Sequence, residues 1–265
     1  MQSISSSGEF RAEGISARLG SNQVLDGLDL PILHAGRLVA LLGPNGCGKS
    51  TLLKSIAGLV HAHHKVLRLD DQDLLVLPAN DRAKQVRYLP QSLPDDVHLT
   101  VMEAILVAIN ARRSTAHGTA LNKVQSTLAD LGIAHLGPRY LDELSGGQKQ
   151  LVGLAQALSH EPKVLLLDEP LASLDLNYQH HVMQLLIRLT QERKMLTLIV
   201  LHDLNSALRY ADLALLMRDG ALVASGVPDE VITPGNLAKA FSIQARIETC
   251  SQGRPYVLVD DLIHI

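Results

Sequence analysis

The stretch Gly43-Pro44-Asn45-Gly46-Cys47-Gly48-Lys49-Ser50-Thr51 decides the fold of this chain. It follows the apolar run 38–42 and precedes the helix-like segment 52–57. In the pattern G-x-x-x-x-G-K-[ST], glycines allow successive backbone N–H groups to point at phosphate oxygens, and the next helix presents its positive end to the same anion. We expect Lys49 to reach the β- and γ-phosphates of a nucleotide and the Ser50 hydroxyl to hold Mg²⁺. The stretch therefore predicts a phosphate-binding loop; the alternative is an ordinary glycine-rich turn.

The composition limits the class of protein. With 265 residues, 46% of them hydrophobic, the chain is long enough for one large α/β domain or for a domain with an inserted lobe. The net charge of −3 and the pI near 6.4 provide no electrostatic attraction for nucleic acid. The chain has no Trp and only two Phe, so few rings can stack on bases. Nucleic acid is therefore not an expected partner.

The cysteines and the apolar runs indicate the compartment. Cys47 and Cys250 make no disulfide framework, which favours a reducing compartment. Cys47 is interpreted as a small loop residue, with an oxidation-sensitive thiol as the alternative. No segment approaches about 18 uninterrupted apolar residues, and the Ser-rich start, residues 1–9, lacks the apolar region of a signal peptide. We expect a protein that is neither secreted nor membrane-spanning.

After the loop, the apolar spacing predicts alternating strands and helices, which is typical of a parallel sheet. These core elements are strands 164–167 and 196–201 and helices 178–190 and 206–211. Other strands are predicted as hairpins or short pieces. One hairpin is predicted within 10–30, around the turn 20–22, and another over 213–217 and 221–224, around Asp219-Gly220. Single short strands are predicted over 65–70, over 86–91 and, after a short helix, over 256–259.

The middle of the chain has a different character. Segments 101–109, 121–131 and 146–158 have apolar residues at helical spacing, with no strand pattern between them. The sequence therefore predicts an α/β fold: a P-loop NTPase core with an N-terminal antiparallel β subdomain and an inserted α-helical subdomain. We expect a flexible N-terminus over residues 1–9 and a main domain over 10–240. The helical insertion within this domain covers about 92–160, and a C-terminal extension follows over 241–265.

A second motif, Leu165-Leu166-Leu167-Asp168-Glu169-Pro170, ends a buried strand with two adjacent carboxylates. Because alternate residues of a strand point in opposite directions, the two carboxylates can have different functions. We expect Asp168 to approach Mg²⁺ through water, as the acidic partner of Ser50, and Glu169 to face an attacking water as general base. The alternative is an acidic cap beside a helix dipole.

A third motif, Leu144-Ser145-Gly146-Gly147-Gln148, opens a predicted helix. A serine followed by two glycines at a helix N-terminus makes a second anion site in the same chain. The alternative is a capped helix start that binds no ligand.

Together these residues resemble the nucleotide-binding subunits of ATP-binding cassette (ABC) transporters, over about residues 10–240. The motifs stand in the family's order: Walker A at 43–51, the Q-loop glutamine Gln91, the signature at 144–148, Walker B at Asp168 and Glu169, the D-loop Ser173-Leu174-Asp175 and the switch histidine His202. The resemblance implies that ATP and Mg²⁺ bind here, with Ser50, Gln91 and Asp168 at the metal and His202 at the γ-phosphate. For His202 alone the alternative is a helix-capping residue, and for Gln91 a surface turn.

The resemblance also implies a head-to-tail homodimer. Each ATP would lie between the Walker A residues of one chain and the signature of the other, the signature residues being Ser145, Gly146, Gly147 and Gln148, with Asp175 at the same interface. ATP hydrolysis would drive transport through membrane permease subunits, which would bind a groove formed by residues 92–104 and the helical lobe. A substrate-binding protein is an indirect partner, and the expected location is the cytoplasmic face of the membrane.

Several details resemble one group within the family. Residues 201–205, together with Gly226-x-Pro228 and Ile232-Thr233-Pro234, look most like bacterial importer ATPases for iron–siderophore complexes, haem and cobalamin. The alternative within transport is an importer of another metal or of an oxyanion such as molybdate. From a different class, a soluble ABC ATPase that clamps nucleic acid or ribosomes is disfavoured by the acidic pI, and a P-loop kinase leaves residues 144–148 unexplained.

Other positions depart from the family pattern. The family usually stacks an aromatic residue on adenine, but the matching position here is Leu19, so we expect affinity to rest mainly on the phosphates. The histidines at 61, 63 and 64 suggest a metal site, but a solvated hairpin loop is favoured because no carboxylate or Cys lies beside them. His180-His181 is interpreted as helix surface.

Overall fold

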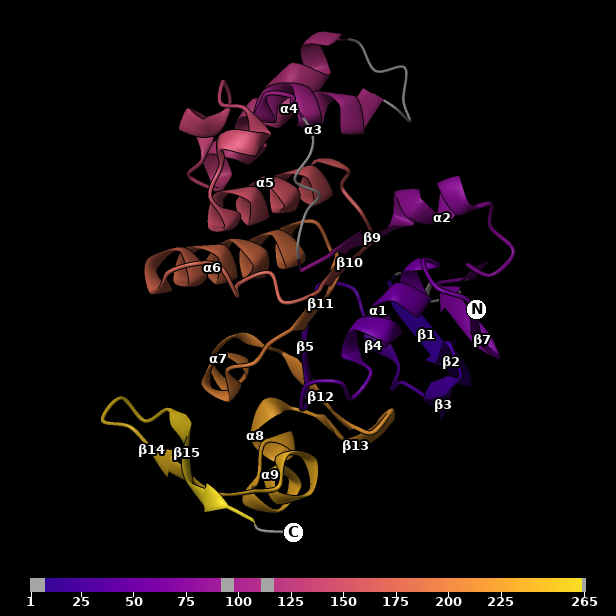
Figure 1. The fold of residues 1–265 in the computed structure, drawn as a ribbon, viewed down its shortest axis with the longest axis vertical. Coiled ribbons are helices and arrows are strands. Elements are labelled where there is room, and N and C mark those ends of the chain that lie inside the picture. The colour runs from indigo at the N-terminus through magenta and orange to yellow at the C-terminus, as the bar shows by residue number, and fades with distance from the viewer. Residues whose placement is uncertain (1–7, 92–97, 111–116, 264–265) are drawn as a thin grey trace, which may run out of the picture.

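The computed structural model describes residues 8–91, 98–110 and 117–263. A six-stranded sheet with the order β13-β12-β5-β11-β10-β9 forms its centre (Figure 1). Strand β13 is antiparallel at one edge and the others run parallel. This confirms the predicted parallel sheet and its terminal hairpin. The strands are β5 (Leu38–Leu42), β9 (Val86–Leu89), β10 (Val164–Leu167), β11 (Leu196–Val200), β12 (Leu213–Arg218) and β13 (Ala221–Gly226).

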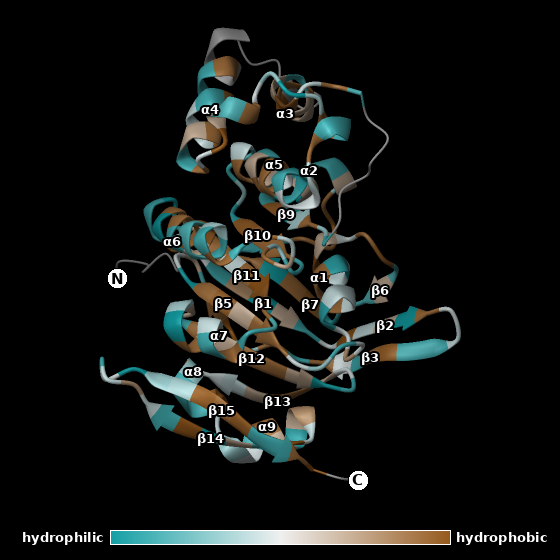
Figure 2. Ribbon diagram, turned by 60° about the vertical axis from the view of Figure 1, so that its left-hand side comes forward, coloured by the Kyte–Doolittle hydropathy of each residue, from teal (hydrophilic) through white to brown (hydrophobic). Residues whose placement is uncertain are grey.

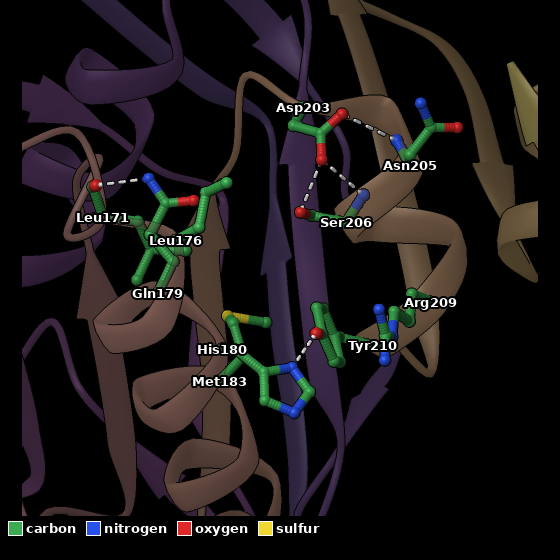
Figure 3. Close-up of a pocket in the computed structure, with 10 residues that line it drawn as sticks. All are labelled: Leu171, Leu176, Gln179, His180, Met183, Asp203, Asn205, Ser206, Arg209 and Tyr210. Atoms are coloured by element: carbon green, nitrogen blue, oxygen red, sulfur yellow. Dashed lines mark hydrogen bonds between the residues drawn. The ribbon is translucent and has the colours of Figure 1, made fainter. Parts of the chain in front are cut away.

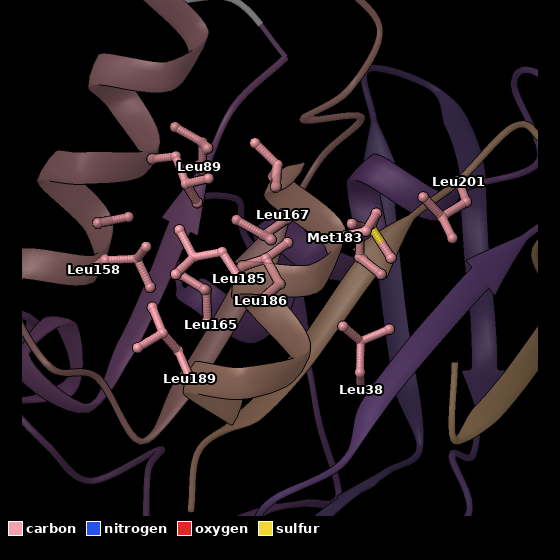
Figure 4. Close-up of a cluster of buried hydrophobic side chains, with 14 of the residues drawn as sticks. Leu38, Leu89, Leu158, Leu165, Leu167, Met183, Leu185, Leu186, Leu189 and Leu201 are labelled. Atoms are coloured by element: carbon pink, nitrogen blue, oxygen red, sulfur yellow. The ribbon is translucent and has the colours of Figure 1, made fainter. Parts of the chain in front are cut away.

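Alternate residues of each central strand enter two separate hydrophobic cores. One core receives Leu165 and Leu167 of β10 and packs them against α6 (Leu176–Glu192) (Figure 4). The other receives Leu166 and packs it with the apolar face of α1 (Lys49–Ala57). The hydrophobic colouring of the central strands in Figure 2 reflects this burial on both faces.

The parallel strands end at one edge of the sheet, where ligands of such folds bind. Three loops leave that edge: 43–48 after β5, 168–175 after β10, and 201–203 after β11. The loop after β11 leads into α7 (Leu204–Tyr210), which confirms the predicted helix there. All three loops carry motifs that the sequence analysis selected.

Antiparallel strands near the N-terminus form two small sheets, with the orders β4-β1-β7-β8 and β3-β2-β6. Strands β2 and β3 make the predicted hairpin. The expectation of a single hairpin over 10–30 is wrong for β1, because β1 pairs with β4 and β7, which come later in the chain. The strands are β1 (Glu9–Glu13), β2 (Ile15–Leu19), β3 (Asn22–Leu28), β4 (Leu33–His34), β6 (Ala62–His63), β7 (Val66–Leu69) and β8 (Gln72–Asp73).

Between β9 and β10, the described residues form mainly helices, as predicted. Its helices are α3 (Val101–Asn110), α4 (His117–Asp130) and α5 (Gly146–Ser159), with 3-10 turns at Ala134–Leu136 and Leu141–Glu143. Their buried side chains join the core under α6. Helix α2 (Ala79–Gln85) was not predicted, since none of its residues is buried and it has no apolar stripe. Residues 92–97 of the expected permease groove lie outside the described residues.

The chain ends in α8 (Pro228–Val231), α9 (Pro234–Phe241) and a hairpin of β14 (Ile243–Thr249) and β15 (Pro255–Leu262). The predicted strand 256–259 lies within β15, but two helices stand where one was predicted, and β14 was not predicted. Apolar and polar residues do alternate over β14, with Ile243, Ala245 and Ile247 in every second position, so this strand was overlooked although the sequence carries a strand pattern there. Among the described residues, no helix is long and apolar enough to cross a bilayer.

The histidine cluster differs from the solvated loop that was expected. His61 and His63 are exposed, but His64 is 7% exposed, and its Nε2 has no hydrogen-bond partner among the described residues. Burial lowers the pKa of His64 to about 4, and the nearby Arg82 and His63 charges act in the same direction. The prediction is therefore wrong for His64, which is a neutral core residue.

His64 should make the fold sensitive to acid. The pKa of His64 is about 4 in the fold against 6.5 in the unfolded chain, so the unfolded state takes up the proton first as the pH falls below 6.5. We expect the native protein to lose up to ~2 kcal/mol more unfolding free energy between pH 7 and pH 5 than His64→Leu does. Urea unfolding at both pH values measures this. The exposed control His61→Leu should behave as the native protein, and an unchanged pH dependence in His64→Leu would contradict the account.

Candidate nucleotide-binding site

The loop 43–48 joins β5 to α1, where the sequence predicts phosphate binding. Gly43 has a φ of 147°, and a Cβ at this position would lie 2.3 Å from the carbonyl oxygen of Met217. Met217 belongs to β12, which pairs directly with β5. The first glycine of the motif is therefore required by the close approach of a neighbouring strand as well as by the turn.

Lys49 is the first residue of α1 and is 5% exposed. Its Nζ donates hydrogen bonds of 2.8 Å to the carbonyl oxygens of Gly43 and Pro44. The ammonium thus lies against the loop, at a helix N-terminus whose free N–H groups already favour an anion. A cavity of about 400 Å³ opens there, a volume typical of small-molecule sites. Its lining combines loop residues with Leu19, Val24, Gln91, Glu169 and His202.

Asp168 follows β10 and is 3% exposed. Its Oδ1 accepts a hydrogen bond of 2.9 Å from the Ser50 hydroxyl, and its Oδ2 accepts one of 2.8 Å from the Tyr88 hydroxyl. Ser50 and Asp168 therefore stand together, as the sequence predicts. A hydroxyl beside a carboxylate supplies the oxygen ligands that Mg²⁺ prefers, so the residues present fit this metal.

Tyr88 is a site residue that the sequence analysis did not identify. It lies in β9, beside β10, and a lone tyrosine in a short strand belongs to no motif. Burial and then the hydrogen bond to Asp168 raise the pKa of the Tyr88 phenol far above its usual value. The hydroxyl therefore remains a proton donor to the carboxylate.

Glu169, Gln91 and His202 converge from the ends of three different strands. Gln91 Nε2 donates a hydrogen bond of 2.7 Å to Glu169 Oε2, while His202 Nε2 lies 2.7 Å from Glu169 Oε1. Glu169 has a φ of 51°, in the left-handed region that non-glycine residues rarely adopt. Such strain is typical of functional sites. Gln91 and His202, both predicted to act at the nucleotide, thus contact Glu169 from two sides, and all three residues line the loop cavity.

The signature residues open α5 as predicted. Ser145 is the N-cap of the helix and forms a capping box: Gln148 N–H donates to Ser145 Oγ at 3.3 Å, and Ser145 N–H donates to Gln148 Oε1 at 3.0 Å. A Cβ on Gly147 would lie 2.6 Å from the carbonyl oxygen of Ser173. The second glycine therefore lets the D-loop lie against the signature.

Asp175, the last residue of the D-loop, is the N-cap of α6 and accepts a hydrogen bond of 2.9 Å from Tyr178 N–H. It lines a cavity of about 210 Å³ together with Ser145, Gly147 and Gln148. This cavity shares no lining residue with the cavity at the loop 43–48. Within one chain, the two predicted anion sites are therefore separate.

Leu19, which lines the loop cavity, and Cys47, which lies in the loop but is not among the lining residues, bear on nucleotide recognition. Leu19 is 50% exposed and lines the cavity together with Val24. Leu19 occupies the position at which the ABC family usually has an aromatic residue. Cys47 is 3% exposed, and burial raises the pKa of its thiol. A buried thiol with a raised pKa reacts slowly with oxidants, which favours the interpretation of Cys47 as a small loop residue.

A separate cavity of about 360 Å³ lies between α6 and α7 (Figure 3). On one side, Asp203 caps α7 by accepting hydrogen bonds from the N–H groups of Asn205 and Ser206, at 3.1 and 2.9 Å. On the other side, His180 Nδ1 lies 2.6 Å from the Tyr210 hydroxyl. His180 and His181 are both exposed, so the prediction of a helix surface is confirmed.

Comparisons with known proteins agree with this geometry. The protein family described as ABC transporter matches residues 25–172. The hemin import ATP-binding protein HmuV of Gloeobacter violaceus is 37% identical over 246 residues, covering 90% of this chain and 89% of its own. The iron(3+)-hydroxamate import ATP-binding protein FhuC of Bacillus subtilis is 34% identical over 257 residues, covering 95% of this chain and 94% of its own.

A solved structure has the same fold as this chain. It is an inward-facing transporter assigned to the metal-chelate type of ABC transporter, and one of its chains superimposes on this one with a TM-score of 0.79. The two chains are 25% identical, and the match covers 96% of this chain and 98% of the other. The similarity thus extends over the sheet, the helical segment and the C-terminal hairpin.

Proposed function

This chain is a member of the ABC transporter family, and we propose that it is the ATP-hydrolysing subunit that energises an importer of iron chelates. The contact of Gln91 and His202 with Glu169, beside the phosphate-binding loop, carries the proposal. A loop of this kind alone would suit any P-loop protein. A carboxylate fixed between an amide and an imidazole next to the γ-phosphate position is what positions a water for attack.

The roles of the site residues follow from their positions. Residues 43–51 would surround the phosphates of ATP, with Lys49 moving from the loop carbonyls to the β- and γ-phosphates. Ser50, Gln91 and Asp168 would hold Mg²⁺, which neutralises charge on the phosphate oxygens when bound. Glu169 would accept the proton of the attacking water, and His202 would donate a hydrogen bond to the γ-phosphate. Both Oε atoms of Glu169 have a partner, so the carboxylate is held in one orientation.

The general-base role predicts the behaviour of Glu169→Gln. The amide keeps the shape of the side chain but cannot take the proton, so we expect ATP turnover to fall roughly 10²-fold or more while ATP affinity is retained. Single-turnover hydrolysis and equilibrium binding of ATP measure the two properties. Asp203→Asn, which changes a carboxylate next to His202 that caps α7, is the control and should keep most of the turnover. Near-normal turnover of Glu169→Gln would remove Glu169 from this role.

We further propose that the active form is a head-to-tail homodimer. The loop cavity holds the phosphate-binding residues and the catalytic cluster, whereas Ser145, Gly147, Gln148 and Asp175 line a separate cavity of the same chain. A second copy can bring its signature onto the nucleotide of the first, and the reverse contact then follows by symmetry. Leu176, directly after Asp175, is 83% exposed, and an apolar side chain at this position suits burial by a partner copy.

Mixing two inactive variants tests the head-to-tail arrangement. Lys49→Ala removes the phosphate-binding charge, and Ser145→Arg blocks the signature, so each homodimer has two defective sites. A mixed dimer has one site with both defects and one site with neither. We expect ATP hydrolysis to reappear when the two variants are mixed, measured as phosphate release. Absence of recovery, with both variants folded and able to exchange subunits, would mean that each ATP site is complete within one chain.

The proposed partners and location follow from the same role. We assign residues 10–240 to the ATPase domain, with a helical insertion over about 92–160 and a C-terminal extension over 241–265. The helical insertion would contact the permease subunits through residues 92–104, and a substrate-binding protein would act through the permease. The subunit would thereby lie at the cytoplasmic face of the membrane, held there by the permease.

The relatives named for hemin and iron(3+)-hydroxamate import support iron chelates as the cargo. An oxyanion such as molybdate remains the alternative cargo. An ATP-driven clamp on nucleic acid is disfavoured by the net charge of −3. The cargo itself does not touch this subunit in the proposed role, so transport has to be measured in cells.

Uptake measurements in cells test the cargo. We expect a Lys49→Ala allele to abolish accumulation of radiolabelled iron supplied as a hydroxamate chelate or as haem, because the permease loses its energy source. Uptake of radiolabelled molybdate in the same cells is the second arm and should not change. Loss of molybdate uptake with normal iron uptake would contradict the proposed cargo but not the ATPase role.

A further inference from the structure

Tyr88 and Asp168 lie on the same face of the central sheet. In the parallel register of β9 and β10, Tyr88 stands opposite Leu166, and Asp168 comes two residues after Leu166. Residues two apart on a strand point to the same face, so Tyr88 and Asp168 are diagonal neighbours. Tyr88 and Leu166 belong to the core covered by α1. The phenol therefore reaches Asp168 from the side of the sheet that carries the phosphate-binding helix.

The two oxygens of Asp168 have different partners. Oδ1 accepts from Ser50, and Oδ2 accepts from Tyr88, at 2.9 and 2.8 Å. With Asp168 only 3% exposed, water cannot easily replace either donor. Two hydrogen bonds to opposite oxygens also fix the rotation of the carboxylate about its bond to Cβ, which one bond would leave free.

We propose that Tyr88 is a positioning residue of the magnesium site, whose hydroxyl fixes the Asp168 carboxylate so that Oδ1 faces Ser50 and the metal. The proposal rests on the proposed ATPase function, because the metal is bound there together with ATP. Hydrogen-bond partners that orient metal ligands typically matter roughly 10- to 100-fold for metal affinity. Tyr88 does not line the loop cavity. In the proposed role it does not contact the metal either and acts only through Asp168.

The phenol is well suited to this role. Its hydroxyl already donates to Asp168 Oδ2 at 2.8 Å. The donor sits on a strand of the central sheet, whose backbone is fixed by pairing with β10. A donor from a loop would have to be ordered each time the metal binds, whereas Tyr88 is already in position.

Tyr88→Phe removes the hydroxyl and keeps the ring in the core, so the variant isolates the hydrogen bond. ATP binding is measured by equilibrium dialysis, first with a chelator and then over a series of Mg²⁺ concentrations. We expect metal-free ATP affinity to stay within about twofold of the native protein, while the Mg²⁺ concentration for half-maximal enhancement rises roughly tenfold. Turnover at saturating Mg²⁺ should recover most of the native value.

Tyr256→Phe is the matched control. The Tyr256 hydroxyl also donates to a carboxylate, Glu248 Oε2 at 3.0 Å, but in the C-terminal hairpin. This variant should keep the native Mg²⁺ dependence. An unchanged Mg²⁺ dependence in Tyr88→Phe would overturn the proposal, as would an equal loss of metal-free and Mg²⁺-dependent binding, which would mark a general structural role. If the native protein showed no ATP turnover at saturating Mg²⁺, the proposed function would fail instead.

Discussion

The buried carboxylate of Asp168 constrains the whole site. A charged group that is 3% exposed has to be hydrogen-bonded within the protein, since leaving it unpaired would cost several kcal/mol. Its two donors come from different elements, Ser50 from α1 and Tyr88 from β9. The loop 43–48, the end of β10 and the end of β9 can therefore not shift independently. The position of the loop 43–48 relative to Glu169, the proposed general base, follows from satisfying this one group.

The neighbouring Glu169 shows the opposite arrangement. Its backbone adopts a φ of 51°, which turns the chain away from the strand direction directly after Asp168. As a result its side chain meets Gln91 and His202 instead of the core. Asp168 is thus held inside the fold, where it can orient a metal, and Glu169 is held at the rim, where water has access. The strained backbone at Glu169 thus places two adjacent carboxylates in different surroundings, as the two proposed roles require.

The parts of the structure that could be predicted are those determined by residues close together in the sequence. The loop 43–51 and Ser145 to Gln148 depend on glycines and caps at fixed spacing, and the central strands are continuous apolar runs. Strand β1 was misassigned because its partners β4 and β7 lie far along the chain, as in the pairs of Glu9 with His34 and of Phe10 with Leu69, and no local pattern encodes such pairing. His64 was taken as solvated although it is 7% exposed and near Arg82 of α2, a neighbour that is distant in sequence. Tyr88 escaped notice because its role exists only through a strand that is adjacent in space.

The capping box at Ser145 bears on how the signature can bind a phosphate. One could expect capping and phosphate binding to compete for the same hydroxyl. The Ser145 oxygen, however, accepts the Gln148 N–H at 3.3 Å and leaves its own proton free to donate. Helix capping therefore fixes the hydroxyl oxygen at the helix end while the proton remains available to an anion. The interaction that starts α5 is thus compatible with the proposed contact between the signature and a nucleotide held by a second copy.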